Sequence, residues 1–295
     1  MKDQSHKELL KKVRRIQIQT KHAVNDVFAG QYHSVFKGRG MEFDRVREYV
    51  PGDDIRAIDW NVTARTGVPH IKKFVEERER TVMLLVDISA SHTFGSTDQL
   101  KRDLAAEMAA VLAFSATQTG DRVGLILFSD RVEKTIAPHK GTPHILRLIR
   151  EILYFEPESR ATDPIPALDW LNHTLTRKSV SFLISDFRFP ATCERSLKIT
   201  ARHHDLIAIR IGDSLEQAWP KAGVVQWRDP ETGEQVLVDT SNTATRQALL
   251  VAELDRLDQQ QTLLRRAGID LIDLRTGEPY EKALIQFFQN RSRRR

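Results

Sequence analysis

Short, unbroken apolar runs alternate along the chain with longer stretches in which apolar residues recur every three or four positions. The clearest run covers 81–91 and ends in Asp87, Ser89 and Ser91. A run that is apolar on both faces predicts a central strand of a parallel sheet, which helices cover on both sides. Further strands are predicted at 123–128, 132–136, 180–185, 206–211 and 269–274. Helices are predicted at about 100–112 (with Gly120 as C-cap), 145–153, 164–175, 193–203, 250–264 and 279–288.

Two strand pairs depart from this alternation. Only residues 129–131 separate 123–128 from 132–136, which is too short for a crossover helix and predicts an antiparallel edge strand. Between Trp219 and Asp239, turn residues interrupt the apolar positions and predict an inserted hairpin. We therefore predict an α/β fold, a doubly wound, mostly parallel sheet with helices on both faces and one antiparallel edge strand.

The N-terminal part of the chain follows a different pattern. Apolar residues with helical spacing, surrounded by basic ones, predict an amphipathic helix over 5–28. Such a helix can lie on a membrane surface, but docking on the chain's own domain is favoured. From 30 to 79, charges crowd Trp60 and Tyr49, and we interpret them as an ion-pair network that fixes a compact loop. Asp53 or Asp54 can cap a helical turn there, and a second binding surface is the alternative.

The chain is therefore divided into a basic N-terminal helix (1–29), a charged region (30–79), the α/β domain (80–289) and a basic tail (290–295). The composition is that of a soluble globular protein, with a formal charge of +5 over 295 residues. No segment reaches the roughly 20 uninterrupted apolar residues of a membrane helix, and the charged N-terminus does not resemble a signal peptide. Cys193 is the only cysteine, which excludes an intrachain disulfide and a cysteine-rich zinc site. We expect a cytoplasmic protein.

Residues with oxygen side chains stand at the predicted ends of two strands and before one helix. They are Asp87, Ser89, Ser91, Thr162 and Asp186. In open α/β sheets, ligands bind beyond the carboxyl ends of the strands. Carboxylates and hydroxyls without thiols or paired histidines favour a hard cation, Mg²⁺ first, with Mn²⁺ or Ca²⁺ as alternatives. Each residue alone is also compatible with a helix N-cap, whereas the three pieces together indicate a metal site.

These five residues resemble the metal-ion-dependent adhesion site of von Willebrand factor A domains. A second signature precedes them, and its residues are Gly38, Gly40, Glu42, Phe43, Arg47, Glu48, Tyr49, Pro51, Gly52, Asp53, Asp54, Arg56, Ile58, Asp59, Trp60, Ala64 and Arg65. This signature resembles bacterial domain-of-unknown-function family 58, whose members carry a von Willebrand A-like domain behind it. Together the two resemblances cover nearly the whole chain.

The resemblance implies a protein-binding module rather than an enzyme. Serine and threonine are neutral ligands, so a bound ion would keep positive charge and an open position for an acidic residue of a client protein. Family members are typically encoded beside MoxR-type AAA+ ATPases, which implies a chaperone-like adaptor in assembly or maturation of client proteins. Further partner contacts are expected at Arg47, Asp53, Asp54, Arg56, Asp59, Trp60 and Arg65. His92, where relatives often have methionine, is expected to be a histidine with satisfied hydrogen bonds outside the ligand set.

Two other functions rest on single features of the sequence. A Mg²⁺-dependent hydrolase of phosphate esters is the main alternative, but no general base and no Lys or Arg clamp is evident beside the site. His139 and His144 could approach it only by way of their loop. The basic ends could meet nucleic acid, acidic lipid or an acidic protein, or be solvated. No interleaving of aromatic and basic residues supports a nucleic-acid partner. Many longer relatives carry N-terminal membrane helices that this chain lacks, which argues against membrane anchoring, and the basic amphipathic helix leaves peripheral membrane contact as an alternative.

Overall fold

The computed structural model describes residues 13–18, 29–36, 41–76, 79–96, 98–189 and 191–294. The body of the protein is a six-stranded sheet in the order β10-β7-β6-β3-β4-β5. Its strands are β3 (Thr81–Asp87), β4 (Arg122–Phe128), β5 (Val132–His139), β6 (Val180–Ser185), β7 (Asp205–Gly212) and β10 (Asp270–Arg275). Neighbouring strands are parallel, except that β5 runs antiparallel to β4 at the edge. The predicted α/β fold with one antiparallel edge strand is confirmed.

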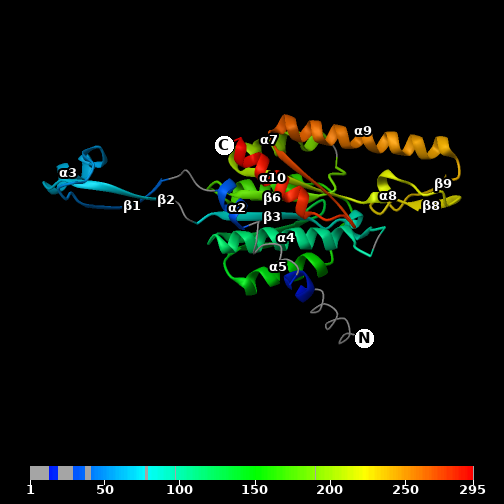
Figure 1. Cartoon of the computed structure of the whole chain (residues 1–295), viewed down its shortest axis with the longest axis horizontal. Helices are drawn as coiled ribbons and strands as arrows, with labels where there is room; N and C mark the ends of the chain where they lie inside the picture. Colours follow the sequence, from blue (N-terminus) through cyan, green and yellow to red (C-terminus); the bar gives the residue numbers. More distant parts are fainter. Residues whose placement is uncertain are drawn as a thin grey trace.

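Helices cover both faces of this sheet (Figure 1). One face carries α2 (Ala29–Phe36), α4 (Lys101–Gln118), α5 (Thr142–Tyr154) and α10 (Glu281–Arg293), and the other carries α6 (Ile165–Thr174), α7 (Glu194–His203) and α9 (Thr243–Ala267). Alternate residues of β3 supply the two cores, because Leu84 belongs to the first and Leu85 to the second. Each of these buried side chains contributes about 1.5–3 kcal/mol to the stability of the fold. Because they point alternately to the two cores, β3 stabilises both helical layers.

Predicted helix ends shift where capping, rather than apolar spacing, decides the boundary. The helix α9 begins well before Leu250, because Asn242 Oδ1 accepts a hydrogen bond from Ala244 N at 2.9 Å. The helix α4 ends before Gly120, whose φ of 86° is a left-handed conformation that favours glycine. Two short elements, α8 (Ser214–Gln217) and the 3-10 turn η4 (Ala191–Cys193), are not predicted, since so few residues show no periodicity.

The described N-terminal residues pack on the body. Residues 13–18 are helical, and Val13 and Ile16 are buried in the same core as α4 and α5. This agrees with the expected docking on the chain's own domain, and the rest of the helix predicted over 5–28 lies outside the described residues. The sequence pattern does not predict α2. Its Tyr32 and Phe36 pack edge-on against Phe288 of α10, with ring centroids 6.3 and 6.0 Å apart.

A two-stranded arm extends from the body (Figure 1). Strands β1 (Met41–Glu48) and β2 (His70–Glu76) are antiparallel, with the 3-10 turn η2 (Ile55–Ala57) and the helix α3 (Trp60–Thr66) between them. We name residues 41–76 the arm. The prediction of a compact loop is wrong here, because neither strand has a long apolar run or a strict alternation of apolar and polar residues that would mark it as a strand.

Ion pairs and caps shape the far end of the arm, as the charge density predicts. Arg47 donates two hydrogen bonds to the Asp53 carboxylate, at 2.8 and 2.7 Å. Asp54 Oδ1 accepts from Arg56 N at 2.9 Å and so caps η2. Asp59 accepts from two backbone amides of the first turn of α3. The expected ion pairing and the expected cap are confirmed, although on a strand pair rather than a loop.

The hairpin predicted between 219 and 239 is present as β8 (Val224–Arg228) and β9 (Gln235–Asp239). It forms a sheet of its own and lies at the end of the molecule opposite the arm (Figure 1). The ring of Trp227 packs on Trp219, at 4.9 Å between centroids, and on Phe94, at 5.7 Å. Phe94 follows the 3-10 turn η3 (Ala90–Thr93) directly, so this contact ties the hairpin to the loop after β3.

Candidate metal centre

The carboxyl ends of β3 and β6 lie side by side, because these strands are parallel neighbours in the sheet. Asp87 ends β3, Asp186 follows β6, and Thr162 lies in the loop before α6. All five predicted oxygen-bearing residues are buried, with exposed fractions of 0% for Asp87 and Ser89, 4% for Ser91, 8% for Thr162 and 2% for Asp186. We name these five residues the edge cluster.

Hydrogen bonds hold Asp87 in one orientation. Its Oδ1 accepts from Ser89 N at 2.9 Å, and its Oδ2 accepts from Ser185 Oγ at 2.7 Å. The hydroxyls of Ser89 and Ser91 lie 3.1 Å apart. The loop after β3 therefore brings one carboxylate and two hydroxyls together through local contacts. Ser185, the last residue of β6, is a supporting residue that sequence reasoning missed, because only the pairing of β3 with β6 places it beside Asp87.

Backbone contacts bring Thr162 to the same edge of the sheet. Ala90 N donates to Arg160 O at 3.2 Å, and Asp163 N donates to Ser129 O at 2.9 Å. Because Ser129 directly follows β4 and Ala90 follows β3, the loop that carries Thr162 spans the ends of both strands.

A carboxylate from the β8–β9 turn completes the surroundings of Thr162. The Thr162 hydroxyl donates to Glu231 Oε1 at 2.7 Å. Burial, followed by the charges of Asp186 and Asp87, raises the pKa of Glu231, while the hydrogen bond from Thr162 acts in the opposite direction. Glu231 is therefore near enough to both aspartates to experience their charge. The sequence analysis missed it, because a glutamate in a turn between two exposed strands is ordinarily solvated.

A buried lysine contacts the second aspartate of the edge cluster. Lys101 is 1% exposed, and its Nζ lies 3.2 Å from Asp186 Oδ2 and 2.6 Å from Glu216 Oε1. Burial opposes ionisation of Asp186, but the charges of Lys101, His92 and Arg188 outweigh it and hold its pKa well below the usual range. The sequence showed no lysine or arginine clamp in motif form, and it is the tertiary structure that places Lys101 beside the site.

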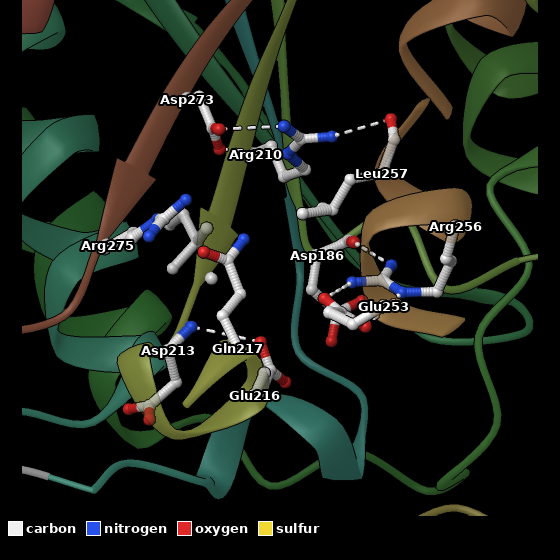
Figure 2. Close-up of a pocket in the computed structure, with 12 residues that line it drawn as sticks. Asp186, Arg210, Asp213, Glu216, Gln217, Glu253, Arg256, Leu257, Asp273 and Arg275 are labelled. Atoms are coloured by element: carbon white, nitrogen blue, oxygen red, sulfur yellow. Dashed lines mark hydrogen bonds and ion pairs between the residues drawn. The ribbon is translucent and has the colours of Figure 1, made fainter. Parts of the chain in front are cut away.

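Beside Asp186, a small polar pocket opens between the ends of β7 and β10 and the helices α8 and α9 (Figure 2). Its charged groups contact one another. Arg210 binds Asp273 through two hydrogen bonds, at 2.9 and 2.7 Å, and Arg256 pairs with Glu253. These ion pairs line the pocket next to Asp186.

His92 is fully buried between the two aspartates. Its Nε2 lies 3.5 Å from Asp87 Oδ2, and among the described residues neither ring nitrogen has a hydrogen-bond partner. One ligand atom each from Asp87, His92 and Asp186 lie within 4.8 Å of one another. The prediction of a histidine with satisfied hydrogen bonds is wrong, since within the described residues its ring has the Asp87 carboxylate at ion-pair distance but no hydrogen bond.

The donor set fits a divalent cation. Two carboxylates and three hydroxyls in the edge cluster are oxygen ligands of the kind that Mg²⁺, Mn²⁺ and Ca²⁺ prefer. The ring of His92, which makes no hydrogen bond within the described residues, offers a nitrogen ligand that transition-metal ions bind more readily than Mg²⁺ does. The ammonium of Lys101 is shared with Glu216, so the positive charge beside Asp186 is partly neutralised. The residues are thus compatible with the ion that the sequence resemblance implies.

Two histidines considered in the sequence analysis lie elsewhere. His144 Nε2 is 2.8 Å from Val123 O, and His139 pairs with Val123 across the β4–β5 ladder. Val123 is near the start of β4, whereas the edge cluster lies at the ends of the parallel strands. The suggestion that these histidines approach the site by way of their loop is therefore wrong.

Gly38 and Gly40 of the second signature lie outside the described residues. The members of the signature that are expected to contact partners lie apart from the edge cluster, on the arm (Figure 1). This group comprises Arg47, Asp53, Asp54, Arg56, Asp59, Trp60 and Arg65. Three aspartates and Arg47 serve the ion pairs and caps described above. Trp60 and Ile55 are 68% and 65% exposed, so the far end of the arm presents large apolar side chains to solvent.

The sheet order and the position of the edge cluster define an α/β protein of the von Willebrand factor A-like class. Residues 45–258 match the family described as "Protein of unknown function DUF58", and the chain belongs to this family. The uncharacterized protein Rv1480 of Mycobacterium tuberculosis (strain ATCC 25618 / H37Rv) is 30% identical over 283 residues, which is 95% of this chain and 89% of the relative. The uncharacterized protein YeaD of Bacillus subtilis (strain 168) is 29% identical over 121 residues, which is 41% of this chain and 27% of the relative.

Among solved structures, the chain is similar to the conserved hypothetical protein BatB from Bacteroides thetaiotaomicron. The TM-score is 0.46 at 14% identity, covering 72% of this chain and 99% of BatB. The SpRpn10 VWA domain gives a TM-score of 0.40 at 11% identity, covering 70% of this chain and 94% of that domain. The fold class rests on the strand order and directions of the chain itself. Helices within the described ranges are too short or too polar to cross a membrane.

Proposed function

We propose that this protein is a metal-dependent protein-binding module without catalytic activity. The observation that supports the proposal is the edge cluster, in which three separate segments bring two carboxylates and three hydroxyls to one buried edge of the sheet. Asp87, Ser89, Ser91, Thr162 and Asp186 would hold the ion, Mg²⁺ first, with Mn²⁺ or Ca²⁺ as alternatives.

The protein's own groups explain how such a site binds rather than reacts. Asp87 is fixed by Ser89 N and Ser185 Oγ, so its orientation needs no rearrangement when a ligand arrives. The hydroxyls are neutral donors and leave positive charge on a bound ion, which supplies a charge-assisted contact to an acidic side chain of a partner. A partner is thereby recognised by one carboxylate, and the surrounding surface adds specificity.

We further propose a cytoplasmic adaptor role between a MoxR-type AAA+ ATPase and a client protein. This role derives from the family resemblance, and the exposed end of the arm supports it by offering a second surface. Its Trp60 and Ile55 are apolar, exposed and next to charged residues, a composition typical of partner contacts. One partner would then bind at the edge cluster and the other at the arm.

The test is affinity capture from native lysate with Mg²⁺ and with EDTA, using the wild type and Asp87→Ala. We expect an AAA+ ATPase or a client to be recovered only with Mg²⁺ and an intact Asp87. Asp255→Ala, at an exposed position of α9, is the matched control and should capture like the wild type.

Two outcomes would replace this proposal. An identical catch in every sample would move the binding surface away from the edge cluster, to the arm or the basic ends. Metal-dependent hydrolysis of p-nitrophenyl phosphate that disappears in Asp87→Ala would favour the phosphate-ester hydrolase instead.

A further inference from the structure

The turn of the β8–β9 hairpin places an acidic side chain of the chain itself against the edge cluster. Glu231 accepts a hydrogen bond from Thr162 Oγ1 at 2.7 Å, and the two residues are 69 positions apart in the sequence. Its side chain is half-buried, whereas the neighbouring Glu234 of the same turn is exposed. The contact is therefore specific to one of the two glutamates.

The conformation of the turn is set by local bonds, which give Glu231 a defined position. Asp229 Oδ1 accepts from Glu231 N at 2.8 Å and from Thr232 N at 2.9 Å. Gly233 closes the turn at a φ of 76° and donates its N–H to Asp229 O at 2.9 Å. On the strand behind it, Trp227 packs against Phe94, so the hairpin is anchored directly over the loop that carries Ser89 and Ser91.

Charge makes this arrangement costly without a cation. Glu231 lies within the electrostatic reach of Asp87 and Asp186, so three carboxylates share one buried edge of the sheet. Lys101 and Arg188 neutralise Asp186, but no ion pair with Glu231 is present among the described residues. The Glu231 carboxylate accepts its hydrogen bond from the neutral hydroxyl of Thr162. A cation bound between the three carboxylates would offset their mutual repulsion.

We propose that Glu231 is an internal ligand of the cation and closes the position that a partner's carboxylate takes. The inference rests on the proposed function, because it concerns the same ion. The resting protein would be self-ligated, and a partner binds by displacing Glu231 with an acidic side chain of its own. The carboxyl group of Glu231 offers the same chemistry as such a partner, so the exchange conserves the ligand set.

The hairpin is built to move without disturbing the body. β8 and β9 form a sheet of their own and share no ladder with the six-stranded sheet. Val224, Val236 and Leu237 are 65%, 56% and 72% exposed, so little apolar surface of the strands is buried against the body. Releasing the turn therefore breaks side-chain contacts at Thr162 and Phe94 but no main-chain pairing with the body.

The first test is calorimetric titration of the metal-free full-length protein with Mn²⁺. We expect Glu231→Gln to weaken Mn²⁺ binding about ten- to hundredfold, since glutamine keeps the size and the acceptor for Thr162 but removes the charge. Glu234→Gln removes the same charge from an exposed position of the same turn and should bind Mn²⁺ like the wild type. Thermal unfolding in EDTA checks that both variants fold.

The second test is hydrogen exchange of the backbone amides of β8 and β9 with and without Mg²⁺. Addition of Mg²⁺ is expected to slow hydrogen exchange of the hairpin amides in the wild type and in Glu234→Gln, but not in Glu231→Gln. Equal Mn²⁺ affinity for all three proteins, with no Mg²⁺ effect on hairpin exchange, overturns the internal ligand and leaves the metal site standing. Absence of Mn²⁺ binding in the wild type overturns both the proposed function and this inference.

Discussion

The edge cluster and the arm both bring aspartates and basic residues together, and the two regions differ in how far these charges are exposed to water. In the edge cluster, Asp87 and Asp186 are 0% and 2% exposed, and the ammonium of Lys101 is buried with them. In the arm, Asp53 pairs with an Arg47 side chain that is 39% exposed. The same residue types thus form a site buried away from solvent in the edge cluster and solvent-exposed ion pairs in the arm.

This difference in exposure determines how much the loss of a charged side chain changes the stability of the protein. A buried charge has lost its hydration and depends on its partners, so removing one partner is expensive. An exposed pair competes with water and salt, and its loss changes stability little. We therefore expect substitutions in the edge cluster to alter folding and ion binding, and substitutions in the arm to alter partner binding alone.

The largest expected effect is the loss of Lys101. Lys101→Met keeps most of the volume of the side chain but leaves Asp186 and Glu216 without the ammonium between them. We expect the free energy of unfolding to fall by about 3–5 kcal/mol in urea titrations with EDTA present. Arg47→Met is the counterpart in the arm and should leave the urea midpoint unchanged. Equal losses in both variants would remove the distinction between the regions.

Addition of Mg²⁺ should stabilise the wild type through the edge cluster. At a concentration one hundred times the dissociation constant, binding contributes about 2.7 kcal/mol to the free energy of unfolding. We expect the rise in thermal midpoint over EDTA to disappear in Asp87→Ala and to persist in Asp53→Ala of the arm. A Mg²⁺ effect that survives in Asp87→Ala would place the ion somewhere else.

The arm should reveal itself in partner affinity. Because Trp60 is 68% exposed, Trp60→Ala is expected to leave the free energy of unfolding unchanged. The dissociation constant for a captured ATPase or client should rise about tenfold, which corresponds to about 1.4 kcal/mol. Ile199→Ala, at an exposed position of α7, is the control. If both variants bind equally well, the arm is not a partner surface.

The smallest expected effect is the acid titration of the arm. The hydrogen bond from Arg47, together with that from Val50 N, lowers the pKa of Asp53. Because the folded pKa lies below the unfolded value of about 3.9, the pair's contribution is complete above that value and is lost as the pH falls through the folded pKa. Carbon-13 NMR of the Asp53 carboxyl group measures this pKa, which Arg47→Gln should raise toward 3.9. If Asp53 titrates with the same pKa in the wild type and in Arg47→Gln, Arg47 is not what lowers that pKa.

Sequence reasoning succeeded where one element carries its own signal. β3 and β6 are apolar on both faces, so they are recognisable as central strands, and their polar last residues then point to an edge site. β1 and β2 were not predicted, because adjacent charged residues interrupt both strands and leave neither an apolar run nor a strict alternation. The hairpin of β8 and β9 was predictable from its turn residues, but its position over the edge cluster was not.

The sequence by itself determined the order of the six strands and the main helices of the body, and the oxygen-bearing residues at the ends of two of these strands. Both depend on features that span only a few residues, namely the spacing of apolar residues and local bonds such as the one from Ser89 N to Asp87. Only the tertiary structure decided that Lys101, Ser185 and Glu231 surround these residues. These side chains are buried beside groups that are far away in the sequence; Lys101 and Glu216, for example, are 115 positions apart. A pattern within a few residues cannot predict such a contact.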